Sequence, residues 1–290
     1  MNAMKLAIPL FVAALAYGPS QGLALPILGD ALASFAVLGA AGVTNVPTST
    51  IDGNLGSAPN ASIGGGYVFT SGGTQANTAI AQQAQLDLDT AIAVLSSLGP
   101  GTVLTNADLA GLTLAPGVYT VHSGVSNLTG ALTLDGGGNV NAFWVFQMDS
   151  DLITSVGSSV NVIGTGAGAG VFWNVRSSAT LNTGSVFEGN ILALASITMG
   201  DAVTLNCGRA LAATGSVTLI HDTIGVGCFG TGEEGSNGLS GSGLEIVGSV
   251  IVDKTTGAVV ARIPEPGTLL LFGFGLAGLF ASRRKLISVA

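Results

Sequence analysis

A short unit, in which a threonine stands between two apolar residues, recurs through the middle of this 290-residue chain. Most successive unit centres lie about 20 residues apart, a spacing at which a unit cannot bury its apolar side chains alone, so the repeat predicts stacked coils around a shared core. Alternate side chains of a strand point to opposite sides, which places the apolar neighbours inside and the central residues outside. The interval from Ile153 to Thr180 is the longest one. The unit centres are Thr113, Thr133, Ile153, Thr180, Thr198 and Thr218.

Two further strand-like segments accompany the threonine units. One follows a glycine-containing corner, as in residues 160–162 and 203–205, and the other completes the turn, as in residues 143–146 and 171–173. Three strands in each turn of about 20 residues predict a mainly β fold, a triangular β-solenoid. The glycine-rich stretch from Gly164 to Gly170 is expected to be an enlarged corner, which accounts for the long interval before Thr180.

One segment lacks the strand pattern. Residues 74–98 contain no glycine or proline, carry apolar residues at helical spacing and end at Gly99-Pro100-Gly101. They predict one amphipathic helix about 37 Å long, with Thr74 or Ser71 as its N-cap. We expect it to pack alongside the third solenoid face, where small side chains allow a close approach. Those side chains are Ala193, Ala195, Ala212 and Ala213.

The start of the chain has the layout of a targeting signal. Lys5 precedes an apolar run from Leu6 to Ala16, which is short for a membrane span and is followed by small residues. This order is typical of a secretory signal peptide, assigned here to residues 1–24, with cleavage after Ala16 or Ala24. A buried N-terminal helix is the alternative.

The end of the chain combines a Pro-Glu-Pro motif, an apolar run over residues 268–282 and a basic cluster. The prolines end any preceding element, the run has about the minimum length for crossing a bilayer, and the basic cluster marks its cytoplasmic end. Residues 263–290 resemble the PEP-CTERM sorting signal, and a plain C-terminal anchor is the alternative. The motif residues are Pro264, Glu265, Pro266, Arg283 and Arg284.

The PEP-CTERM resemblance implies several partners and a location. It implies export in a Gram-negative bacterium to the cell surface or beyond, with the C-terminal helix anchored transiently in the inner membrane. It further implies processing by an exosortase, and often a link to extracellular polysaccharide.

Export also bears on Cys207 and Cys228, because two cysteines of a secreted domain usually pair. Their separation in the sequence is close to one turn, and neighbouring coils about 4.8 Å apart lie within disulfide range. The sequence therefore predicts a disulfide between them, with free buried thiols as the alternative. Beyond them, residues 231–262 begin as a Gly/Ser-rich linker, and residues 244–260 can form a small hairpin.

Charged residues make up only 8% of the chain, and the formal net charge is −8. Without the two targeting ends, 4 basic and 15 acidic residues remain, a formal charge of −11. A nucleic-acid-binding protein needs a basic surface to neutralise phosphates, so this function is excluded. The polar surface of the chain must come from Thr, Ser, Asn and Gly.

No residue pattern indicates an enzyme, a metal site or a cofactor. His122 and His221 lack the spacing of metal ligands and are expected in surface loops. Asp149 and Asp151 are expected at a solvated corner or as an incidental calcium contact, rather than as the carboxylate pair of a polysaccharide-cleaving enzyme. The large aromatic residues are expected in packed positions rather than on a sugar-binding surface. They are Trp144, Phe172 and Trp173.

Six blocks of sequence, in order, resemble the DUF3494 or ice-binding-protein-like family. The resemblance covers residues 28–226 and implies a discontinuous right-handed triangular β-helix, here in residues 25–230, with one long α-helix packed alongside. An early segment and the late coils then interleave in space. Family members characterised as ice-binding use one flat β face, although no motif common to the family assigns its residues. The blocks are residues 28–38, 51–56, 82–88, 112–119, 171–173 together with 177–181, and 189–194.

The repeated threonines are the feature with functional content. Stacked coils would place them about 4.8 Å apart on one flat sheet, with their rotamers restricted by β-branching. Such an array can order water into an ice-like layer, with hydroxyls anchoring the water and methyls limiting bulk hydration. We therefore expect an exported ice-binding protein whose partners are ice and ordered water, weakened where Ile153 interrupts the row. An extracellular structural or adhesive protein that binds polysaccharide is the alternative. The expected ice-binding residues are Thr113, Thr133, Thr180, Thr198 and Thr218.

Overall fold

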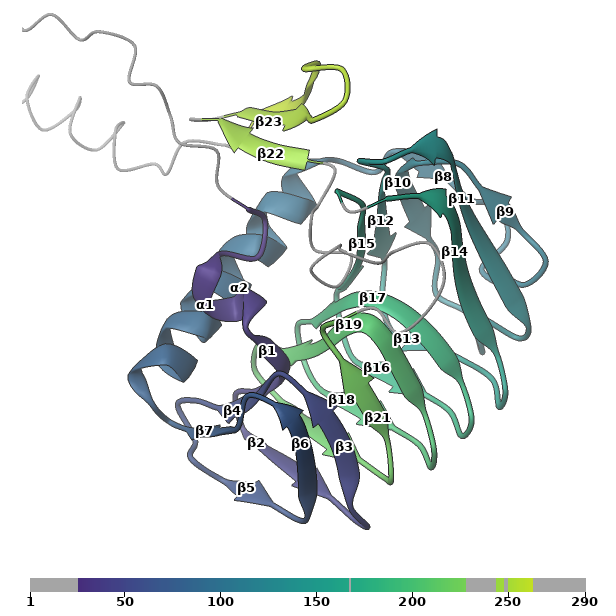
Figure 1. The fold of residues 1–290 in the computed structure, drawn as a ribbon. Helices are drawn as coiled ribbons and strands as arrows, with labels where there is room; N and C mark the ends of the chain where they lie inside the picture. Colours follow the sequence, from purple (N-terminus) through teal and green to yellow (C-terminus); the bar gives the residue numbers. More distant parts are fainter. Residues whose placement is uncertain (1–25, 167, 228–243, 248–249, 263–290) are drawn as a thin grey trace, which may run out of the picture.

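The computed structural model describes residues 26–166, 168–227, 244–247 and 250–262. Its parallel strands form stacked coils with three faces (Figure 1). We call the face beside the long helix face A and the other two face B and face C. This arrangement confirms the predicted mainly β solenoid with one long helix alongside.

The strands of each face, in spatial order, are as follows. Face A consists of β8 (Thr102–Val103), β10 (Gly117–Val121), β12 (Phe143–Met148), β15 (Gly170–Val175), the second halves of β17 (Val186–Ala193) and β19 (Thr204–Ala212), β1 (Phe35–Gly39), β4 (Asn54–Ser57) and β7 (Thr74–Ala76). Face B consists of β9 (Thr113–Leu114), β11 (Ala131–Asn139), β14 (Ser159–Thr165), the first halves of β17 and β19, β21 (Thr223–Gly225), β3 (Ser49–Asp52) and β6 (Tyr67–Ser71). Face C consists of β13 (Leu152–Ile153), β16 (Ala179–Leu181), β18 (Ile197–Met199), β20 (Ser216–Leu219), β2 (Gly42–Asn45) and β5 (Ile63–Gly64).

The stacking order differs from the chain order. The early strands β1, β2 and β3 pair with the late strands β19, β20 and β21, so residues 35–52 continue the coils that end at residue 225. The chain completes that end with β5, β6 and β7. The long helix then returns along face A to the opposite end, where β8 begins (Figure 1). The coils are therefore discontinuous in sequence, as the family resemblance implies.

The long helix α2 spans Ala79–Ser97, and the hydroxyl of its N-cap Thr78 accepts a hydrogen bond from the Ala81 N–H. The predicted start at residue 74 is wrong. Residues 74–76 form β7, which pairs with β4, and Asn77 then takes a left-handed φ of 50°. With 19 residues the helix is about 28 Å long rather than about 37 Å. The short helix α1 (Asp30–Ala33) packs beside it.

Two hydrophobic cores hold the fold. The inner core fills the solenoid and contains Trp144 and Trp173, and the second core lies between face A and the helices and contains Phe172. The predicted packed positions of these aromatic residues are confirmed. Along the inner core the Phe146 and Trp173 rings stack with centroids 4.0 Å apart. The described members of both cores lie within residues 26–262.

The helix packs on the expected face but not on the expected alanines. Leu192 and Leu211 belong to the second core beside α2, whereas Ala193 and Ala212 point into the inner core. Side chains alternate along a strand, so a shift of one residue exchanges the two sides. Ala195 is half-buried at a corner, and only Ala213 packs against the helix-side core.

The buried Arg209 on β19 ties the early segment to a late coil. Its guanidinium donates two hydrogen bonds to the carbonyl oxygen of Ala33, from Nη2 at 2.7 Å and from Nε at 3.2 Å. Nη1 donates to Oδ1 of Asn190 at 2.7 Å. Burial lowers the pKa of Arg209 to about 10, which leaves the side chain charged at neutral pH. The two bonds to Ala33 join residues 176 positions apart in the chain.

A three-stranded antiparallel sheet stands where the sequence predicts a linker with a hairpin. Its strands are β22 (Leu244–Val247), β23 (Val250–Asp253) and β24 (Val259–Arg262). Leu244 and Ile251 are fully buried in the second core. The sheet is thus part of the packed fold.

Several predictions concern residues beyond this described part. The signal peptide, the Pro264-Glu265-Pro266 motif, the apolar run 268–282, Arg283 and Arg284 lie outside the described residues. Neither α1 nor α2 is long and apolar enough to cross a membrane. Cys207 is buried and no described cysteine is free, but Cys228 lies outside the described residues. Their pairing stays a prediction.

Candidate functional site

Face C carries a regular row of outward threonines. Four adjacent strands, β16, β18, β20 and β2, each place a threonine at the same position, and these threonines are direct partners between coils. Neighbouring coils repeat at about 4.8 Å, so four threonines span about 14 Å along the stack. The row with its two ends, in spatial order, is Ile153, Thr180, Thr198, Thr218, Thr44 and Gly64.

A second row consists of serines two residues before the threonines, about 6.6 Å away along each strand. Ser178, Ser196 and Ser216 occupy this row, and Gly42 follows them. The backbone N–H of Ser196 donates to Oγ of Ser178 at 3.4 Å, and that of Ser216 donates to Oγ of Ser196 at 3.2 Å. The hydroxyls of Ser178 and Ser196 are therefore each held by the next coil. We call the two rows together the Ser-x-Thr surface.

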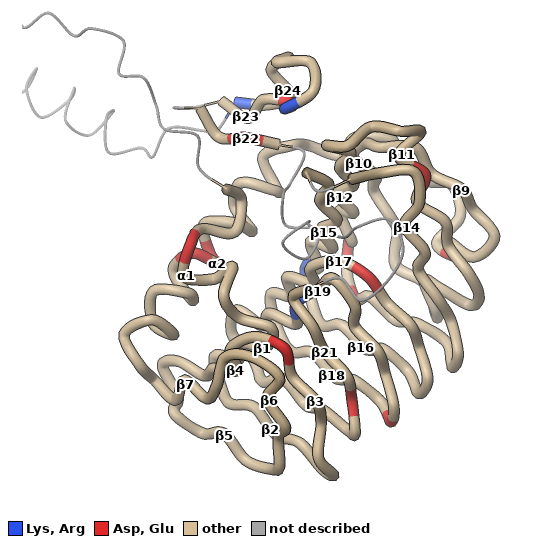
Figure 2. Tube along the Cα trace, in the orientation of Figure 1, with Lys and Arg blue, Asp and Glu red and all other residues tan. Residues whose placement is uncertain are grey.

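The residue between each serine and threonine is buried and fixes the strand to the inner core. These residues are Ala179, Ile197 and Val217, and Val43 follows in β2. The strands β16, β18, β20 and β2 contain no charged residue (Figure 2). The Ser-x-Thr surface is thus a small lattice of hydroxyls and methyls on a rigid backing.

The prediction of one column of five threonines is wrong in one respect. Thr180, Thr198 and Thr218 are neighbours on face C, as expected. Thr113 and Thr133 pair with each other on face B, where the next partner of Thr133 is Asn161. The five threonines therefore divide between two faces.

The length of one coil explains the misplacement. Thr133 pairs in the next coil with Asn161 and not with Ile153, so this coil is longer than the one from Thr113 to Thr133. Twenty residues after Thr133, at the usual repeat length, the chain has not yet returned to face B. The residue at that position is Ile153, which lies on face C.

Four residues of the Ser-x-Thr surface were absent from the predicted site. Thr44 belongs to an imperfect repeat far upstream, and only the discontinuous stacking brings it beside Thr218, where their hydroxyls are 3.4 Å apart. Ser178, Ser196 and Ser216 are visible in sequence as the repeated tripeptides Ser-Ala-Thr, Ser-Ile-Thr and Ser-Val-Thr.

Face B is also regular but carries charge. Thr204, Thr223 and Thr50 are partners in one outward row. The neighbouring row contains Glu188 beside Asn206, and Asp52 beside Ser71. One carboxylate oxygen of Glu188 is buried, but the partly exposed Asp52 carboxylate binds water around its own charge and so interrupts a repeated pattern of hydroxyls and methyls.

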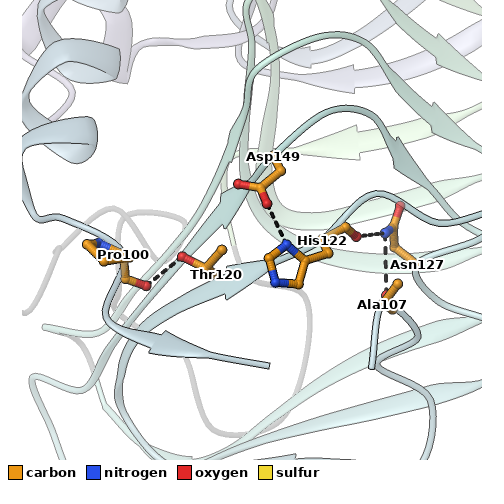
Figure 3. Close-up of polar contacts among 6 residues, drawn as sticks. All are labelled: Pro100, Ala107, Thr120, His122, Asn127 and Asp149. Atoms are coloured by element: carbon orange, nitrogen blue, oxygen red, sulfur yellow. Dashed lines mark hydrogen bonds and ion pairs between the residues drawn. The ribbon is translucent and has the colours of Figure 1, made fainter. Parts of the chain in front are cut away.

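The two histidines lie at exposed corners, as expected. Nδ1 of His122 and Oδ2 of Asp149 are 2.6 Å apart, and both side chains are about half exposed (Figure 3). The amide of Asn127 donates to the His122 carbonyl oxygen and so holds the loop rather than the imidazole (Figure 3). His221 faces Asp201 at 3.6 Å, with both side chains exposed. These pairs link neighbouring coils at the solenoid surface.

Asp151 and Asp222 have shifted pKa values for structural reasons. Hydrogen bonds from the Ser177 hydroxyl and the Ser178 N–H lower the pKa of Asp151. Burial raises the pKa of Asp222 to about 7, although the N–H groups of Val203 and Ile220 donate to its carboxylate. Both carboxylates bind backbone groups at coil corners. Within the described residues, no three His, Cys, Asp or Glu side chains are grouped to hold a metal ion.

Comparison with known proteins gives a consistent result. Residues 37–225 match the model of the ice-binding-like family. An ice-binding protein from Nostoc sp. (strain HG1) is 39% identical over 274 residues, covering 92% of this chain and 89% of that protein. An ice-binding protein from Colwellia sp. is 31% identical over 242 residues, covering 77% and 93%.

Solved structures agree with the sequence relatives. The crystal structure of an ice-binding protein from an Antarctic biological consortium matches with a TM-score of 0.62 and 36% identity, covering 69% of this chain and 90% of that one. The ice-binding protein of the Antarctic ascomycete Antarctomyces psychrotrophicus gives the same TM-score with 34% identity, covering 70% and 98%. At the other end, residues 262–285 match the PEP-CTERM protein-sorting motif.

Proposed function

The chain belongs to the ice-binding-like family, and from this premise we propose that it is an exported protein that adsorbs to ice through the Ser-x-Thr surface of face C. The observation that carries the choice of surface is the in-register row of Thr180, Thr198, Thr218 and Thr44. Family membership supports ice as the ligand, and the row of threonines supports face C as the binding surface. The proposed mechanism is non-covalent and includes no catalytic step.

The physical basis of adsorption is pre-ordering. The strand backbone fixes the spacing between threonines, and β-branching restricts χ1, so little side-chain entropy is lost when water becomes ordered on the surface. Each hydroxyl can hold one water through a hydrogen bond that is enthalpically close to a direct contact. The neighbouring methyls leave fewer competing orientations for that water. Many weak contacts on one rigid lattice then add up to firm adsorption.

Face C fits this mechanism better than face B. The central strands of face C present uncharged serine and threonine rows, whereas Glu188 and Asp52 lie in the rows of face B. A carboxylate orders water around its own charge, and this order does not repeat with the coil spacing. We therefore assign ice adsorption to face C and use face B as the comparison surface.

The C-terminal motif bears on the export of the protein rather than on its ligand. A match to the PEP-CTERM motif at residues 262–285 supports export, and we propose that an exosortase processes this end after the apolar run has held the chain in the inner membrane. The preceding β22–β24 sheet packs on the helix-side core, so the anchor would leave the solenoid from the side of face A.

Ice capture tests the proposal. Residues 26–262, labelled with a fluorophore, are expected to enter a slowly growing ice hemisphere, whereas Thr198→Tyr places a bulky ring on the lattice and should be excluded with the solutes. Exclusion of the unmodified protein would contradict ice adsorption. Its retention on bacterial polysaccharide in the same experiment series would support the adhesive alternative instead.

A further inference from the structure

The coil at one end of the solenoid has no neighbour within the described residues. It consists of β5, β6 and β7, one edge strand for each face, and each of these strands pairs on one side only. In Figure 1 it forms the lower end of the stack. The open edges of this end coil follow from that one-sided pairing within the described residues.

The inner core reaches this open end. Ile63, Tyr67 and Phe69 pack against it but are only partly buried, because no further described coil covers them. The rings of Tyr67 and Phe69 lie 6.1 Å apart between centroids. An apolar layer that is covered from one side only favours association, since further burial contributes roughly 25 cal/mol for each Å² removed from water.

The backbone of β6 offers hydrogen bonds to a partner. The carbonyl oxygen of Gly66 accepts from the Ser49 N–H at 3.3 Å and therefore points toward β3. Backbone groups alternate in direction along a strand, so the N–H and C=O groups of Tyr67 and Phe69 point away from β3. Proteins often protect such edges with charged residues or proline. Residues 63–76 contain neither.

The shape of this end selects the partner. A single extended peptide can pair with one of the three edges, but another solenoid end can meet all three together. The opposite end of this chain fits less well, because Leu109 is already buried there and Asp108 adds a charge. Two copies of the β5–β6–β7 end, related by a two-fold axis, present identical edges that run antiparallel and can pair.

Charge supports the same choice. The chain without its targeting ends carries a formal charge of −11, so two copies repel each other over most of their surface. The uncharged end coil is a place where they can approach without opposing like charges directly. We propose that this protein forms a dimer in which two β5–β6–β7 ends meet end to end and join their edge strands.

Sedimentation equilibrium of residues 26–262 tests this dimer with a matched pair of variants. Val68 on β6 and Val186 on β17 lie in the same outward row of face B and are 53% and 45% exposed. We expect a dimer for the unmodified chain. Val68→Lys should raise the dimer dissociation constant by about tenfold or more, because like charges meet across the new strand pair. Val186→Lys, in the interior of the stack, should leave it unchanged.

Hydrogen exchange identifies the surface independently. In the dimer, the amides of Tyr67 and Phe69 should become protected at concentrations where the mass doubles. A monomer at every soluble concentration would overturn the proposal. So would a dimer that Val68→Lys leaves intact and that protects residues 102–114 instead. At a concentration low enough for the parent to be a monomer, both lysine variants should keep its circular dichroism spectrum and unfolding midpoint, which separates loss of association from loss of folding.

Discussion

Each hydroxyl of the Ser-x-Thr surface has a defined position because its residue has a defined neighbour in the next coil. Ser178 and Ser196 accept hydrogen bonds from the backbone of the following strand. Thr198 lies between Thr180 and Thr218 and shares their environment. The local alternation of apolar and polar residues was enough to predict that these threonines point outward. It was not enough to place Thr44 beside them, because that contact joins residues 174 positions apart.

At the same scale, Arg209 is expected to be a key determinant of stability. Arg209→Ala leaves two acceptors, the partly buried Ala33 carbonyl oxygen and the buried Oδ1 of Asn190, without their guanidinium partner. Each lost partner costs about 1–3 kcal/mol, and the cavity adds to this, so the unfolding free energy should fall by about 3 kcal/mol or more. Urea unfolding measures the change. Arg176→Ala, at an exposed arginine, is the control and should alter stability by less than about 0.5 kcal/mol.

Among the elements, the sequence predicted that the helix α2 exists, but it did not predict the residue at which the helix begins. Its periodic apolar residues and its end before Gly99-Pro100-Gly101 are local signals. Its start is decided by tertiary structure, because Thr74 to Ala76 are drawn into β7 by pairing with β4. The sequence alone shows no competitor for these residues, since β4 lies about 20 residues upstream and pairs only once the coil has closed.

The observed start of α2 leads to a paired prediction. Thr78→Ala removes the side-chain acceptor of the Ala81 N–H and should destabilise the protein by about 1 kcal/mol, with a range of about 0.5–2 kcal/mol. Thr74→Ala, at the N-cap position that the sequence favoured, should cost less because Thr74 is an exposed residue of an edge strand. Thermal unfolding of both variants decides between the two starts. A larger loss for Thr74→Ala would contradict the capping role of Thr78.

The division of the threonines between two faces also belongs to the scale of elements. The repeat was correctly recognised, but a spacing counted in residues equals a coil only where coils have equal length. The coil that begins at Thr133 closes only at Asn161, beyond Ile153, so the usual spacing ends on a different face. Corner lengths depend on packing between coils, and the sequence carries only weak signals for them.

For the whole molecule, the solenoid and the helix could be predicted, whereas the order of stacking came only with the family resemblance. Residues 35–76 complete a stack that begins at residue 102, and α2 links its two ends. This arrangement extends face C by β2 and β5 beyond β20. Because the early strand β2 stacks on the late strand β20, Thr44 adds a fourth threonine to the row, and no further late coil is needed. It also leaves the end coil from which we infer the dimer.

The central claim is that face C, and not face B, adsorbs to ice, and thermal hysteresis of two tyrosine variants tests it most directly. Thr198 lies in the middle of the Ser-x-Thr surface, and Thr204 occupies an outward position on face B in the same part of the stack. We predict that Thr198→Tyr loses most of the thermal hysteresis of residues 26–262, whereas Thr204→Tyr retains it, with equal unfolding midpoints. Retained hysteresis in Thr198→Tyr together with its loss in Thr204→Tyr would contradict the account and assign the ice-binding surface to face B.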